Sequence, residues 1–224
     1  MIRMRDFGRA PLMALAVGCA IGATSAELAV AQSVGGRAYG ASVDTPVASQ
    51  GRTVVAALPS TPSPTGDVRT AEADALSVPG ALSASFLNST AAGAVEQGGA
   101  SAETVASVAD VNILNGLIRA AEVVAVATSG RDGSSAWSNG LGSTFEDLVV
   151  GGVRVVSGDR TVAPNTRMSL PGVGYVVLNE QRRTGNGSTS SGITVNMIHV
   201  FLKNALTGST VGEIIVGSAS SRVE

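Results

Sequence analysis

The sequence predicts an all-β protein, mainly an antiparallel β-sandwich, preceded by a cleaved signal-peptide helix. Only 14% of the 224 residues are charged, 3% are aromatic, and Lys203 is the single lysine, while Ala, Gly, Ser, Thr and Val dominate. This composition has too little charge for a disordered chain and too little Leu, Glu and Lys for a helical bundle. Many short runs also alternate apolar and polar residues between Gly, Pro, Asn or Ser, a spacing typical of a sandwich.

The first 31 residues have the features of an export signal. The basic residues at its start are Arg3, Arg5 and Arg9. An apolar run over residues 11–23 follows, and the small residues Ala29 and Ala31 precede Gln32 as at a signal-cleavage site. The run is shorter than the about 20 apolar residues that a membrane helix needs. We therefore expect cleavage before Gln32, no transmembrane segment afterwards, and an extracellular or cell-surface location.

Two alternative locations stay open, the periplasm and a membrane to which Cys19 is anchored by a lipid. Residues 16–19 loosely resemble a lipidation box, but Ala16 stands where a larger aliphatic residue is usual, and the chain stays apolar after Cys19. Because Cys19 is the single cysteine, no disulfide joins the strands of the mature chain. A chain of this size can bury about 70% of its unfolded surface, so we expect residues 32–224 to form a single domain.

The N-terminal half of this domain is predicted to alternate strands and turns. Residues 39–43 and 54–58 have strand patterns, and residues 59–66 form an exposed loop of Pro, Ser and Thr, because proline cannot donate to a ladder. From residue 68 we expect a strand, a turn at Pro79-Gly80, a strand through Phe86, and a loose stretch to Gly99. Residues 105–128 fit either a helix or two strands. The β-branched residues and the hairpin dipeptide Asn115-Gly116 favour two strands.

The C-terminal half has the clearer pattern. Residues 145–150 and 153–156 predict a hairpin around Gly151-Gly152. The further predicted strands cover residues 170–178, 193–202 and 210–216, with turns at residues 185–187 and 207–209. No repeat of 20 to 50 residues is evident, so one sandwich is favoured over a propeller or solenoid.

Several segments of the mature chain resemble the bacterial choice-of-anchor P family. They are GRAYGASV (36–43), ADVN (109–112), PNTRMSLPGVG (164–174), VLNEQ (177–181), ITVNMIHV (193–200) and GEIIVG (212–217). The resemblance implies an exported, β-rich surface protein of unestablished function with a C-terminal anchor. It also implies cysteines near the ends of the central and final strands, where this chain has residues 128–130 (Thr-Ser-Gly) and 219–221 (Ala-Ser-Ser). Since neither a sorting tail nor an apolar anchor precedes Glu224, we expect a released or non-covalently attached protein.

No residue pattern predicts a catalytic, cofactor or metal site. His199 is the only histidine, and period-two alternation places it on one strand face with Val195, Met197 and Phe201, so it lacks the partners of a metal site or triad. The segments 110–112 and 131–133 contain aspartate, but they lack the run of alternating oxygen-bearing side chains that a calcium-binding loop needs. We expect His199 to be a packed or edge-lying histidine.

The polar cluster of Asn179, Glu180 and Gln181 is the strongest candidate for ligand contact. In a glycosidase, Glu180 would need a second carboxylate. The acidic residues available for that role are Asp110, Asp147 and Glu213. The favoured interpretation is structural: Asn179 and Glu180 satisfy hydrogen bonds where a strand ends.

Trp137, in the predicted polar loop 130–142, is the second candidate. We expect it to act as a lid over one end of the sandwich, with ligand contact as the alternative.

These patterns predict an exported cell-surface or extracellular structural or adhesive protein without catalysis. The alternative is a secreted polysaccharide-binding or polysaccharide-active protein that uses Glu180 or Trp137. The expected partners are envelope or matrix polysaccharide, other surface proteins, or further copies of the chain through exposed sheet edges. The formal net charge is −2 and no basic block occurs, which argues against nucleic acid.

Overall fold

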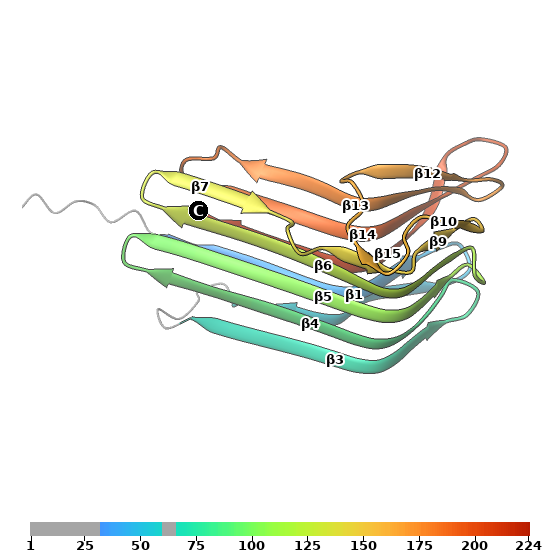
Figure 1. Cartoon of the computed structure of the whole chain (residues 1–224), viewed down its shortest axis with the longest axis horizontal. Coiled ribbons are helices and arrows are strands. Elements are labelled where there is room, and N and C mark those ends of the chain that lie inside the picture. The colour runs from blue at the N-terminus through green and yellow to red at the C-terminus, as the bar shows by residue number, and fades with distance from the viewer. Residues whose placement is uncertain (1–31, 60–65) are drawn as a thin grey trace, which may run out of the picture. The chain divides into compact units, whose positions relative to one another are not determined.

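The computed structural model describes residues 32–59 and 66–224, and within these ranges it contains strands and no helix. Two antiparallel sheets face each other, so the predicted all-β sandwich is confirmed. Figure 1 shows the long strands running side by side in both layers. The predicted signal segment, including Cys19, Ala29 and Ala31, and residues 60–65 of the proline-rich loop lie outside the described residues.

The six-stranded sheet has the order β12-β13-β14-β15-β1-β2. Its strands are β12 (Thr166–Leu170), β13 (Gly174–Gly185), β14 (Ser191–Lys203), β15 (Thr210–Val223), β1 (Val34–Asp44) and β2 (Ser49–Ala57). The first and last long strands of the described chain, β1 and β15, are therefore neighbours in this sheet.

The nine-stranded sheet has the main order β10-β9-β6-β5-β4-β3. These strands are β10 (Val153–Arg154), β9 (Val149–Val150), β6 (Ile118–Asp132), β5 (Gly99–Ile113), β4 (Leu82–Glu96) and β3 (Asp67–Val78). Three short strands extend it, namely β7 (Ser135–Asn139), β8 (Thr144–Glu146) and β11 (Asp159–Arg160). β7 and β8 pair with β6, and β11 pairs with β8.

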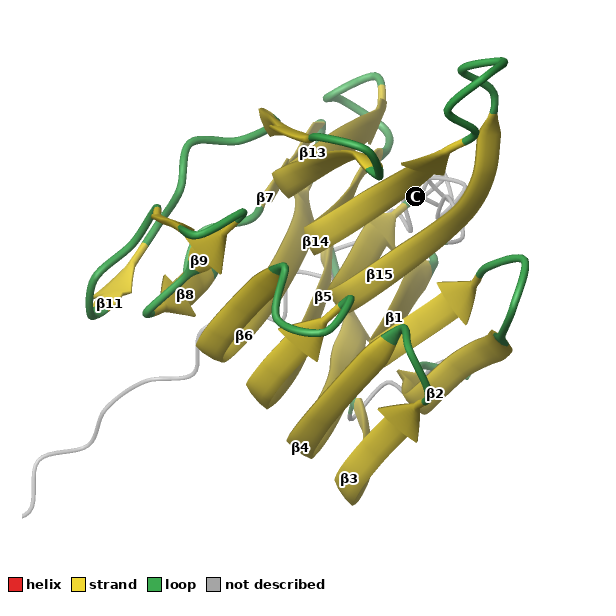
Figure 2. Cartoon of the chain, turned by 90° about the vertical axis from the view of Figure 1, so that its right-hand side faces the viewer, coloured by secondary structure: helices red, strands yellow, loops and turns green. Residues whose placement is uncertain are grey.

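The main core lies between the sheets and consists of small and branched apolar side chains. β15 packs across β5 and β6, and β1 packs across β4 (Figure 2). Alanine and glycine let the layers approach closely. A Cβ atom added at Gly40 of β1 would lie 2.7 Å from Cδ2 of Leu87 on β4, so only glycine fits there without a shift of Leu87.

Left-handed backbone interrupts strands of both sheets. In the six-stranded sheet, Asn179 has φ 48° and Gly217 has φ 65°, and the pairing of β14 with both neighbours skips Met197 between them. In the nine-stranded sheet, Phe86 has φ 47° and Asp110 has φ 49°. In the six-stranded sheet each of the three strands leaves one residue out of the pairing at the same level, so the alternation of faces reverses in all three without a change of register. We call the line through Asn179, Met197 and Gly217 the kink.

The two-strand interpretation of residues 105–128 is confirmed. β5 and β6 pair along their length, and the turn between them contains Asn115 at φ 55° and Gly116 at φ 90°. The Gly151-Gly152 hairpin between β9 and β10 is also confirmed. Both turns use residues that tolerate positive φ.

Four sequence expectations about the strands are wrong. The loose stretch before Gly99 is part of β4, because its backbone pairs with β3 on one side and β5 on the other. The predicted strand 170–178 contains a turn, closed by the bond from Val173 N to Leu170 O (2.9 Å). The run 145–150 is interrupted at Asp147, with φ 48°. The predicted loop 130–142 contains β7.

None of the described residues belongs to a helix that is long and apolar enough to cross a membrane.

Candidate functional site

A groove with a volume of about 810 Å³ lies on the outer face of the six-stranded sheet. Its polar lining comes from five strands, β1, β2, β13, β14 and β15. Basic residues line it at Arg37, Arg52, Arg182 and Arg222, whereas Glu213 is the one acidic residue among its described lining residues. The groove is thus more positive than the chain as a whole, whose formal net charge is −2.

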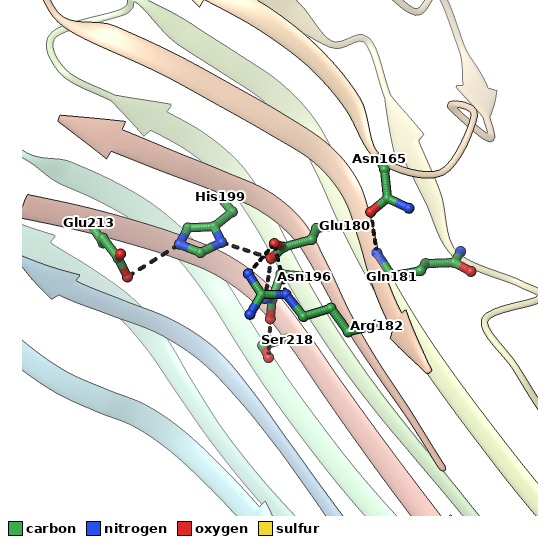
Figure 3. A network of polar contacts seen from close by, with 8 residues as sticks. All are labelled: Asn165, Glu180, Gln181, Arg182, Asn196, His199, Glu213 and Ser218. Atoms are coloured by element: carbon green, nitrogen blue, oxygen red, sulfur yellow. Dashed lines mark hydrogen bonds and ion pairs between the residues drawn. The ribbon is translucent and has the colours of Figure 1, made fainter. Parts of the chain in front are cut away.

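Glu180 lies beside this groove and is the centre of a polar network (Figure 3). Its Oε1 accepts hydrogen bonds from Arg182 Nε (3.1 Å) and Nη2 (2.7 Å). Its Oε2 accepts a bond from Asn196 Nδ2 (2.8 Å) and lies 2.8 Å from His199 Nδ1. Glu180 is only 6% exposed, and both of its oxygens have partners. A buried carboxylate with this many donors is well satisfied.

The pKa of the Glu180 carboxyl is lowered from 4.5 to about 2. The largest cause is the hydrogen bond from His199, which favours the ionised form, and burial opposes it. The hydrogen bonds from Asn196 and Arg182 lower the pKa further. Because the ionised carboxylate only accepts hydrogen bonds, His199 Nδ1 must carry a proton and donate it.

The network continues on both sides of Glu180. His199 Nε2 lies 3.4 Å from Glu213 Oε2, a long contact, and the imidazole packs on the Phe201 ring with 3.9 Å between centroids. Ser218 Oγ donates to Asn196 Oδ1 (2.8 Å), which fixes the amide so that its Nδ2 faces Glu180. Both ring nitrogens of His199 therefore face carboxylates, as Figure 3 shows.

The kink puts His199 on the opposite sheet face from the one that simple alternation predicts. Before the kink, Val195 faces the core, and after it Ile198 and Val200 do, with Met197 buried in the core as well. His199 therefore does not share a face with Val195 and Met197, contrary to the expectation from simple alternation. It lies on the outer face with Phe201, next to Glu180.

Asn179 and Glu180 do not act as the predicted strand end, because β13 continues to Gly185. Asn179 is buried, and its Nδ2 donates to Val162 O (2.7 Å). Its Oδ1 accepts a bond from Gln181 Nε2 (3.0 Å). Asn179 thus ties the loop before β12 to the sheet, and Glu180 serves the network on the outer face.

The three carboxylates named as partners of Glu180 have different positions. Only Glu213 approaches Glu180, with the imidazole of His199 between them. Asp110 accepts a bond from Ser85 Oγ (2.5 Å), and Asp147 pairs with Arg154 (3.2 Å). Asparagine tolerates positive φ, so a reversal of alternation at Asn179 could have been predicted, and it would have placed Arg182 and Thr184 on the same face as Glu180. The sequence contains no pattern that predicts which residues of other strands lie beside Glu180.

Trp137 is not a lid over the end of the sandwich. It lies on β7 against Gly130, where an added Cβ would come within 2.4 Å of its ring, and it is 48% exposed. Its neighbour Ala136 packs instead into the small second core with Val34 and Val223. A hollow of about 280 Å³ beside the Trp137 ring is lined by β4, β5 and β6.

The described residues contain no group of three or more His, Cys, Asp or Glu side chains that could hold a metal ion.

No family model matches the sequence, and neither a curated protein nor a solved structure matches it. What the protein does is therefore inferred from its own geometry.

Proposed function

We propose that the protein is an exported cell-surface or extracellular β-protein with a structural or adhesive role and without catalysis. The observation that carries this proposal is the open groove on the outer face of the six-stranded sheet, whose one nearby buried carboxylate, Glu180, is fully engaged by the protein itself. A wide polar face of this kind suits recognition of an extended partner. The basic start of the chain and the small residues before Gln32 support export.

The contacts within the network support a role without acid–base catalysis. With a pKa of about 2, Glu180 has no proton to donate near neutral pH. His199 Nδ1 contacts Glu180 and its Nε2 faces Glu213 at 3.4 Å, so neither of its printed contacts is with a hydroxyl nucleophile. The nearby Ser218 donates its proton to Asn196 instead. We infer that the network holds the kinked strands in register.

The alternative is a secreted polysaccharide-binding protein, and the lining of the groove favours it. Hydroxyl and amide groups of Thr194, Asn196, Ser218 and Ser220 lie between arginines on the same face. Sugars are bound by such hydrogen-bonding groups and by charged side chains. If the protein instead cleaved a polysaccharide, Glu180 and Glu213 would be its two carboxylates. The imidazole of His199 occupies the space between them.

Two measurements test the proposal. Cells are separated into cytoplasm, envelope and medium, and the mass and N-terminus of the exported chain are determined. We expect the protein in the envelope or medium, beginning at Gln32 and without lipid. The purified protein is then incubated with isolated envelopes and with a panel of polysaccharides and esters, and we expect retention on envelopes without hydrolysis.

A cytoplasmic location would contradict the proposal. So would hydrolysis that is lost in Glu180→Gln at unchanged thermal stability, because Glu180 would then be catalytic. A mass that corresponds to an acylated Cys19 would contradict the released form and support the lipoprotein alternative.

A further inference from the structure

We propose that the groove binds an anionic polysaccharide, with carboxylate or sulfate groups, across the strands of the six-stranded sheet. This inference rests on the proposed function, because it names the chemistry of the partner on the same face. The sequence has no basic block, and the arginines that create the positive charge are far apart along the chain. Sheet pairing brings them together.

The register of three strand pairs defines a row of four side chains. Arg182 on β13 is opposite Thr194 on β14, Thr194 is opposite Ser220 on β15, and Ser220 is opposite Arg37 on β1. All four line the groove. Since neighbouring strands lie about 4.8 Å apart, the backbones of Arg182 and Arg37 are about 14 Å apart. Two guanidinium groups therefore flank two hydroxyl groups, an arrangement that suits a sugar chain with acidic groups along it.

The charges at the β1 side of the row are available for a ligand. Arg37 and Arg52 are exposed, and neither forms an ion pair with any carboxylate of the described residues. The guanidinium of Arg52 lies over the Tyr39 ring, 5.2 Å from its centroid, which holds it above the sheet. Arginine binds carboxylate and sulfate oxygens with two parallel hydrogen bonds.

The two arginines at the β13 and β15 side of the groove contact carboxylates of the protein but remain accessible to a ligand. Arg182 binds Glu180 through Nε and Nη2, while its side chain stays 66% exposed. Arg222 lies in the next row and has only a 3.8 Å contact with Glu224. The engaged Glu180 fixes the position of Arg182, and fixed donors lose less entropy when a ligand binds.

The lining favours an acidic sugar chain over a nucleic acid. Single-stranded nucleic acids stack their bases on exposed aromatic rings, but Tyr39, the aromatic residue in the groove, is buried at 7% exposure. Between Arg182 and Arg37, Ser220 Oγ donates to Arg37 O (3.1 Å) and keeps its lone pairs as acceptors, and Thr194 supplies a second hydroxyl on the groove. A hydroxyl can donate to and accept from sugar hydroxyls.

The test measures binding of the purified protein to polygalacturonate and chondroitin sulfate by calorimetry at low and at physiological salt. Neutral dextran and double-stranded DNA serve as comparison ligands. We expect binding of at least one acidic polysaccharide, weakening as salt rises, and none of dextran. Arg37→Gln should weaken this binding about tenfold, Arg37→Glu should weaken it more, and Arg37→Lys should restore part of it.

The matched control is Arg119→Gln, which removes an exposed arginine from the nine-stranded sheet. We expect it to leave binding unchanged, and thermal unfolding should show that all variants are folded. The inference is overturned if no acidic polysaccharide binds at low salt, if Arg37→Gln and Arg119→Gln have equal effects, or if DNA binds more tightly than the polysaccharides. Envelope retention of an exported protein that binds none of these probes would leave the proposed function standing and overturn only this inference.

Discussion

Ser129 on β6 and Ser221 on β15 connect the two sheets through their side chains. Their Oγ atoms lie 2.7 Å apart, and the residues are 0% and 4% exposed. They lie near the ends of two long paired strands, one in each sheet. A buried pair of hydroxyls thus links the two sheets at this point.

Replacing both residues, Ser129→Cys with Ser221→Cys, should create a disulfide under oxidising conditions. The two positions are 92 residues apart, so the cross-link should raise the free energy of unfolding by about 4.6 kcal/mol through the entropy of the unfolded chain. Denaturant unfolding with and without reductant measures this gain. Each single cysteine variant is the control, and free thiols that persist in the double variant under oxidising conditions would contradict the prediction.

Glu180→Gln should remove an acid-dependent contribution to stability. The pKa of Glu180 is lower in the folded protein, about 2, than the ordinary value of 4.5. The ionised carboxylate therefore stabilises the fold above pH 4.5, and this stabilisation is lost as the pH falls toward 2. The difference corresponds to about 3 kcal/mol. Urea unfolding from pH 7 to pH 2 should show a smaller acid-induced loss in Glu180→Gln than in the unchanged protein. Equal slopes in both proteins would refute the prediction.

Asn179→Ala should destabilise the protein more than Asn179→Gly does. Both variants lose the buried bond to Val162 O, which costs about 1 to 3 kcal/mol. Only alanine adds the penalty of about 1 kcal/mol for a side chain at positive φ, because Asn179 has φ 48°. Thermal unfolding of the two variants gives the comparison. A lower midpoint for glycine than for alanine would show that the left-handed backbone is not the cause.

The protein should self-associate through its open sheet edges as its concentration rises. β2 and β3 end the two sheets, and Val68 on β3 is 61% exposed. Edge strands with few lysines do not block pairing with another chain. Light scattering from micromolar to millimolar concentration tests this, and Val68→Lys should shift association to higher concentration. A monomer over the whole range would contradict it.

The local features of this chain were predictable because they depend on neighbouring residues. Asn115-Gly116 tolerates positive φ and therefore predicted the hairpin between β5 and β6. The turn at Leu170–Val173 was missed although it contains Pro171-Gly172, because the apolar residues around it have a strand pattern. Glu180 and Asn179 were recognisable as candidates from the sequence. Their separate roles, in the outer-face network and in the bond to Val162 O, were not predictable.

The sequence by itself determined that this chain forms sheets of small and β-branched residues, since composition and alternation act locally along a strand. Only the tertiary structure decided which face each polar side chain occupies. The kink at Asn179 and Gly217 reverses the alternation, so His199 reaches Glu180 on the outer face. The row from Arg182 to Arg37 likewise exists only because β13, β14, β15 and β1 pair in one register, and lateral pairing between distant segments is set by the packing of the whole domain.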